Sequence, residues 1–281
     1  MDAHELIWRS LNKLAKRYGA QVRAARQSLT PESVHAFRVA SRRLIAALDL
    51  VDAALDNKTA GSVGGSLKKG LKKLGPLRDI HVHQTLVSTY RKVSTDVDRL
   101  LSASRREEKA LVRENRRDLR KIERTDIEKC LQRLEKKLEK RERQIGRARF
   151  IASFTRRIRH TTSGLARLQT RLDPLHPKTF HQLRLQLREL RYQLEFLQSA
   201  LDIESRRLAR LKTYQGQLGG IQDLSVAINE LQEMKGTDPE VVQILTQRRD
   251  RKMKQFLTKA RTLPDFLRGF EIHSSLRMAK R

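Results

Sequence analysis

Residues 34–50 read VHAFRVASRRLIAALDL, and residues 180–196 read FHQLRLQLRELRYQLEF. Aligned at an offset of 146 residues, the two stretches share a histidine, two arginines and the same spacing of apolar residues. A second pair follows, LGPLRDIHV at 74–82 and LGGIQDLSV at 218–226, at an offset of 144. Because two blocks recur in the same order at nearly the same offset, we predict an internal duplication with halves at 1–145 and 146–281.

Both copies of the first block have the periodicity of a helix that is buried along one side. At about 100° per residue, Phe37, Leu44 and Leu48 fall on one face, as do their counterparts in the second copy. Such a stripe is typical of a helix packed in a bundle. A second apolar row borders the opposite, basic face, so we expect each helix to be covered on two sides. That row consists of Val39, Ala46, Leu50, Leu185, Tyr192 and Phe196.

The rest of the chain favours an all-α fold. No stretch alternates apolar and polar residues as a half-buried strand does. Thr30-Pro31 and Asp238-Pro239 both place a capping side chain before a proline, which predicts helix starts. Gly219-Gly220 predicts a helix break. Residues 99–149, rich in charge with a thin apolar stripe, are expected to form one or two long helices that connect the halves.

The composition indicates a polyanionic partner. Lys and Arg number 61 against 32 Asp and Glu, which gives a formal net charge of +29. The sequence contains no run of about 18 apolar residues, so it predicts no membrane span. The first residues lack the apolar core of a secretion signal. A single cysteine, Cys130, excludes an internal disulfide framework and a multi-cysteine metal site. We therefore expect a cytoplasmic protein that does not enter membranes.

The basic faces of the two repeated helices are the strongest candidate site. They carry almost no balancing acid, whereas solvated helix faces usually mix both signs, so we interpret them as anion-binding. Two further basic rows are expected to face these stripes across a groove: Lys68, Lys69, Lys72 and Lys73 in the first half, and Arg206, Arg207, Arg210 and Lys212 in the second. The two histidines, His35 and His181, either donate to the anion or orient Arg38 and Arg184; the sequence leaves both roles open.

The blocks resemble the CHAD family, the conserved histidine α-helical domain. Its signature, His-x-x-Arg-(Val/Ile)-x-x-(Lys/Arg)-Arg-Leu-Arg, is matched twice, by HAFRVASRRL at 35–44 and HQLRLQLRELRY at 181–192. The resemblance covers the chain as a single domain, 1–281, and implies two helical bundles of the four-helix type related by a pseudo-two-fold axis. It also implies a basic channel between them that binds inorganic polyphosphate. Ile45, Glu189 and Gln222 depart from the pattern, and we leave Glu189 out of the site.

No constellation of catalytic residues is evident. Gly65 and Gly70 have the spacing of a Walker loop, but Leu71 follows where lysine is required. His81 and His83, two residues apart, are poorly spaced for zinc, and we interpret them as a surface pair. We expect Cys130 to be a packing thiol, and Asp79 and Asp223 to orient the basic groups by ion pairing. The prediction is a protein that is not an enzyme and holds no metal or cofactor.

We therefore predict non-catalytic binding of inorganic polyphosphate between the two halves, with association with polyphosphate granules left open. The alternative is a nucleic-acid-binding protein, which the net charge supports equally well. Against this alternative, the sequence has no helix-turn-helix or RNP motif and few aromatic residues for base stacking. The predicted polyphosphate-binding residues are His35, Arg38, Arg42, Arg43, Lys68, Lys69, Lys72, Lys73, His181, Arg184, Arg188, Arg191, Arg207, Arg210 and Lys212.

Overall fold

The computed structural model describes residues 2–88, 96–120, 125–233 and 239–276, and the regular structure in these ranges is helical throughout. The predicted all-α class is therefore confirmed. None of these helices is both long and apolar enough to span a membrane. The helices are α1 (Ala3–Gln27), α2 (Pro31–Leu55), α3 (Gly61–Lys73), α4 (Gly75–Ser88), α5 (Asp96–Arg120), α6 (Thr125–Ile145), α7 (Arg147–Gln169), α8 (Pro177–Leu201), α9 (Ser205–Glu233), α10 (Pro239–Ala260) and α11 (Leu263–Leu276).

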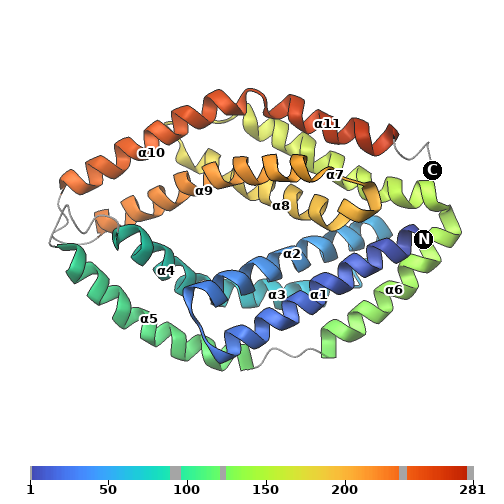
Figure 1. Cartoon of the computed structure of the whole chain (residues 1–281), viewed down its shortest axis with the longest axis horizontal. Helices are drawn as coiled ribbons and strands as arrows, with labels where there is room; N and C mark the ends of the chain where they lie inside the picture. The colour runs from blue at the N-terminus through green and yellow to red at the C-terminus, as the bar shows by residue number, and fades with distance from the viewer. Residues whose placement is uncertain (1, 89–95, 121–124, 234–238, 277–281) are drawn as a thin grey trace.

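The helices form an elongated oval with two sides (Figure 1). Helices α1 to α6 lie on one side and α7 to α11 on the other, with α2 and α8 facing each other near the middle. Contacts between α2 and α8, α1 and α8, and α4 and α9 join the sides. The described residues of the highly charged region 99–149 form most of α5, all of α6 and the first turn of α7. Between α6 and α7, Gly146 adopts a φ of +77°, a value that favours glycine.

Helices α2 and α8 match each other in detail. Both have 25 residues, both begin at a proline, and their bounds differ by the 146 residues that the sequence repeat predicts. Each ends at an aspartate in the left-handed conformation, Asp56 and Asp202, with φ values of 53° and 50°. Thr30 accepts a hydrogen bond from the amide of Ser33, as the predicted cap requires. These matches support the predicted duplication.

The second repeated block forms a different helical structure in each half, and the difference centres on Pro76. In the first half, Pro76 lacks an N–H to continue the helix, and α3 and α4 are separate helices interrupted at Leu74. At the equivalent position Gly220 keeps its N–H, and α9 runs through it without interruption. The predicted break at Gly219-Gly220 is therefore wrong. Packing of α9 against α8 and α10 outweighs the low helix propensity of the two glycines, about 1 kcal/mol each.

One hydrophobic core runs through both halves. The predicted apolar stripes are buried: Phe37, Leu44 and Leu48 are at most 1% exposed, and residues of both α2 and α8 belong to the same cluster. A smaller cluster, which includes Val87 and Ile228, lies where α4, α5, α9 and α10 meet. The main core is therefore shared by the two predicted halves.

The start of α1 is capped by a side chain from α6. The carboxylate of Glu142, which is 8% exposed, accepts hydrogen bonds from the amides of Ala3 and His4 at 3.2 and 2.6 Å and contacts His4 Nδ1 at 2.7 Å. The preceding residue, Asp2, makes no side-chain cap of its own. Glu142 therefore satisfies amides that the helix cannot satisfy internally.

We expect Glu142→Ala to lower the free energy of unfolding by about 1–3 kcal/mol, because two amides and a histidine lose a buried acceptor. Urea denaturation followed by circular dichroism measures the change. The matched control is Glu139→Ala on the same helix, which removes an exposed ion pair with Arg143 and should cost less than about 0.5 kcal/mol. Equal losses in the two variants would contradict a capping role for Glu142.

Candidate functional site

Four arginines from the two repeated helices interact electrostatically between α2 and α8. Burial lowers the pKa of Arg188 to about 10, and the positive charges of Arg42, Arg184 and Arg38 contribute to this lowering. Burial likewise lowers the pKa of Arg38 to about 10, with Arg42 contributing next. The basic faces of the two copies therefore meet, and we call Arg38, Arg42, Arg184 and Arg188, together with Arg78, the arginine cluster.

Arg78, on α4, belongs to this cluster and is absent from the predicted site. Its charge lowers the pKa of His35 and contributes to the lowered pKa values of Arg38 and Arg42. It also acts across the halves, because it interacts with Asp223 on α9. The signal was available in the sequence, since Arg78 precedes the aspartate of the second repeated block.

Two carboxylates accompany the arginine cluster. Partial burial raises the pKa of Asp79 and of Asp223, and the nearby arginines oppose that rise. The expectation that they orient the basic groups by direct ion pairing is wrong for the described residues, among which neither carboxylate has an ion-pair partner within 4.0 Å. Their effect on the arginines is therefore exerted over a longer distance.

The first arginine of each copy lies against the glycine of the second block. A Cβ atom on Gly75 would lie 3.9 Å from Nη1 of Arg38, and one on Gly219 would lie 3.9 Å from Nε of Arg184. The hydrogen bonding differs. Arg38 donates to the carbonyl of Leu71 in the last turn of α3 at 2.6 Å, whereas the buried Nε of Arg184 has no hydrogen-bond partner in the described part of the chain.

The two histidines have different neighbours. Nδ1 of His181 lies 2.6 Å from Oε1 of Gln222, and because an amide oxygen only accepts, Nδ1 carries the hydrogen. The position equivalent to Gln222 is occupied by Arg78 in the first half. There, partial burial lowers the pKa of His35, and Arg78, Arg42 and Arg38 lower it further. His35 is exposed and His181 is half-buried, so both remain accessible beside the arginines.

Arg43 and Arg191 are held by contacts within the protein. Nε of Arg43 lies 3.0 Å from the carboxylate of Glu195, and Nε of Arg191 lies 3.7 Å from it. Both guanidinium groups lie over the ring of Tyr192, with their Cζ atoms 5.7 and 4.8 Å from its centroid. These two predicted site residues therefore stabilise the contact of α2 with α8.

The predicted lysine row is not brought to the arginine cluster as a unit. Lys68 forms an ion pair with Asp49 at 3.0 Å, and Lys73 forms one with Asp118 at 2.7 Å. Lys69 and Lys73 line a separate pocket beside α1 and α5. Lys72 is exposed on α3.

The second predicted basic row lies at the start of α9, against α11. Arg207 lies over the ring of Phe270 at 5.5 Å, and Arg210 lies over the ring of Phe266 at 4.7 Å. Arg206 pairs with Glu204 at 2.6 Å. Arg207 is twelve residues from Gly219, or roughly 18 Å along the helix, so this row is distant from the arginine cluster. Lys212 is exposed.

The interpretation of His81 as a surface residue is wrong. Its side chain is buried, and Nε2 lies 3.1 Å from the carboxylate of Glu108 on α5, which also accepts a hydrogen bond from Gln84. Cys130 is buried, as expected for a packing thiol. Among the described residues no group of three or more histidine, cysteine or carboxylate side chains is placed to hold a metal ion.

Comparisons with family models and with solved structures find similar proteins. The family model described as the CHAD domain matches residues 6–232. The crystal structure of the CHAD domain from the plant Ricinus communis superposes with a TM-score of 0.63 at 20% identity, covering 95% of this chain and 93% of that one. PptA from Streptomyces chartreusis superposes with a TM-score of 0.58 at 13% identity, covering 95% of this chain and 99% of that one. A search of curated protein sequences finds no match.

Proposed function

Because this chain belongs to the CHAD family, we propose that it binds inorganic polyphosphate at the arginine cluster and catalyses no reaction on it. The family resemblance implies this ligand, and the cluster supplies the chemistry that the ligand needs. Guanidinium groups donate charge-assisted hydrogen bonds to phosphoryl oxygens, often in pairs.

The observation that carries the proposal is the unbalanced charge of the cluster. Five arginines interact there, and the carboxylates coupled to them are Asp79 and Asp223. The lowered pKa values of Arg38 and Arg188, about 10 in each case, mean that partial burial and mutual repulsion disfavour their charged forms. A bound polyanion offsets that repulsion. The relief of repulsion therefore adds to the binding free energy that the hydrogen bonds contribute.

The position of the cluster favours a thin chain over a duplex. Its arginines come from α2, α4 and α8, so a ligand must enter between helices of both halves to meet them all. Polyphosphate is a single chain with a charge on every phosphate. Double-stranded DNA is far wider and would reach fewer of these groups.

A competition titration tests the proposal against the nucleic-acid alternative. Fluorescently labelled polyphosphate bound to the protein at fixed salt is titrated with unlabelled polyphosphate or duplex DNA at equal charge concentration. We expect polyphosphate to displace the label at concentrations about tenfold or more below those of DNA, because only the thin chain reaches both repeated helices. Equal displacement, or stronger displacement by DNA, would favour a nucleic-acid-binding protein.

Binding should be linked to proton uptake by His35. In the free protein, partial burial and the neighbouring arginines lower the pKa of this histidine, so it is neutral at pH 7. Polyphosphate brings negative charge beside it and raises its pKa, so affinity should increase as the pH falls from 7 through about 6.5. Calorimetric titrations at pH 6.5 in two buffers of different ionisation enthalpy count the protons. His35→Gln should take up fewer protons than the wild type, and equal uptake would exclude His35 as their source.

A further inference from the structure

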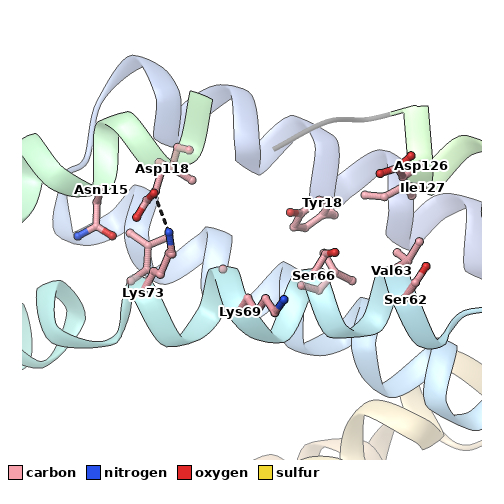
Figure 2. Close-up of a pocket in the computed structure, with 14 residues that line it drawn as sticks. Tyr18, Ser62, Val63, Ser66, Lys69, Lys73, Asn115, Asp118, Asp126 and Ile127 are labelled. Atoms are coloured by element: carbon pink, nitrogen blue, oxygen red, sulfur yellow. Dashed lines mark ion pairs between the residues drawn. The ribbon is translucent and has the colours of Figure 1, made fainter. Parts of the chain in front are cut away.

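A pocket of about 370 Å³ lies outside the arginine cluster, between α1, α3, α5 and the start of α6. Figure 2 shows Tyr18 of α1 and Lys69 of α3 on opposite walls, with the Lys73–Asp118 ion pair at one end. Asp126, which is exposed, lies at the other end beside Ile127. The volume lies in the range of small-molecule sites.

The wall is mainly apolar with a few polar groups. Val63, Leu67 and Leu119 are each at most 5% exposed and contribute the apolar surface. Tyr18 is 3% exposed, yet within the described residues its hydroxyl has no hydrogen-bond partner. Burial raises the pKa of Tyr18 to about 12, so the hydroxyl remains a donor at neutral pH. In the same part of the chain the ammonium group of Lys69 has no hydrogen-bond or ion-pair partner.

At the equivalent face of the second half lies a pocket with a different lining, which includes Arg206, Arg207 and Phe266. At the offset of 144 residues, Ser62, Ser66 and Gly70 correspond to Arg206, Arg210 and Tyr214. In the second half the large side chains occupy the corresponding helix face, where Arg210 lies over the rings of Tyr214 and Phe266. The two pockets therefore differ in lining: small residues of α3 contribute to the first, and arginines of α9 beside Phe266 line the second.

We propose that this pocket binds a small amphipathic monoanion, with its apolar body against Val63, Leu67 and Leu119 and its charged head at the Lys69 ammonium. The Tyr18 hydroxyl donates a second hydrogen bond to the same head group. Lys73 is neutralised by Asp118, and the carboxylate of Asp126 lies at the far end of the pocket, so the anionic head is placed at Lys69, away from Asp126. This site is independent of the polyphosphate proposal, because none of the five arginines lines the pocket.

Octanoate is a suitable probe, and calorimetric titration of the full chain in 0.3 M NaCl measures its binding. We expect one site with a dissociation constant of roughly 0.1–1 mM, as the size of the ligand allows. Octanol and octylammonium should bind at least tenfold more weakly, because they lack the charge that Lys69 attracts. Equal binding of all three ligands would overturn the choice of an anion.

Three variants distinguish the pocket from general attraction to a basic protein. Lys69→Met should weaken octanoate binding about tenfold or more, whereas the matched control Lys16→Met, on the exposed face of α1, removes the same charge and should have no effect. Gly70→Leu fills the pocket without changing the charge and should also weaken binding at least tenfold. A Cβ at Gly70 would lie 3.9 Å from Phe37, an ordinary contact, and circular dichroism checks that the variant folds. If Lys69→Met and Lys16→Met weaken binding equally, or if folded Gly70→Leu binds as the wild type does, the proposed site is wrong.

Discussion

Replacing Arg188 by glutamate is expected to weaken polyphosphate binding by about 100-fold, or roughly 3 kcal/mol. The substitution removes a charge-assisted hydrogen bond and places a negative charge where the phosphate chain would lie. Arg188 is coupled to Arg38, Arg42 and Arg184, so it lies centrally in the arginine cluster. Arg42→Glu should have an effect of similar size. Fluorescence anisotropy with labelled polyphosphate measures both affinities.

Although these substitutions weaken polyphosphate binding, they should not lower the stability of the folded protein. Because Arg188 repels its neighbours in the free protein, Arg188→Glu should leave the midpoint of thermal unfolding unchanged or raise it.

The control for the binding measurement is Arg116→Glu, which makes the same change of charge on the exposed face of α5 and should reduce polyphosphate affinity less than about threefold. Equal losses at Arg188 and Arg116 would indicate a diffuse polycation and refute the assigned site.

Polyphosphate affinity should also fall steeply with salt. If the five arginines of the cluster each neutralise one phosphate, the logarithm of the association constant should fall with the logarithm of salt concentration with a slope of about −3.5. Between 50 and 200 mM salt the affinity would then fall about 100-fold. Titrations at four salt concentrations give the slope, and Arg188→Glu should make it shallower. A wild-type slope between 0 and about −1 would mean that the cluster does not bind the phosphates.

Much of this arrangement could be predicted from the periodicity of the repeated helices. The stripe of Phe37, Leu44 and Leu48 is buried, and the arginines on the opposite face meet their counterparts across the two halves. A helical period fixes which side chains share a face, and the repeat indicates which faces correspond. The family match and the all-α fold agree with what these blocks indicated.

The basic rows outside the repeated helices could not be placed from the sequence. Lys73 and Arg210 have the composition of an anion-binding face, but their partners, Asp118 and Phe266, come from segments distant in the chain. Helical periodicity says nothing about which segment will cover a face. Arg43 similarly pairs with Glu195, 152 residues later, and only the packing of α2 against α8 shows this.

The interruption at Leu74 has a consequence for the hydrogen bonding of two equivalent arginines. With α3 ending before it, the carbonyl of Leu71 accepts a hydrogen bond from Arg38, which holds that guanidinium group in place. Uninterrupted α9 provides no such anchor for the buried Nε of Arg184 within the described residues. Ordering an arginine side chain costs up to about 2 kcal/mol of conformational entropy. Because Arg38 is already ordered by its hydrogen bond in the free protein, ligand binding does not incur this cost at Arg38. Two arginines of equal charge in equivalent positions should therefore contribute unequally to affinity, with the larger share from the half that contains the proline.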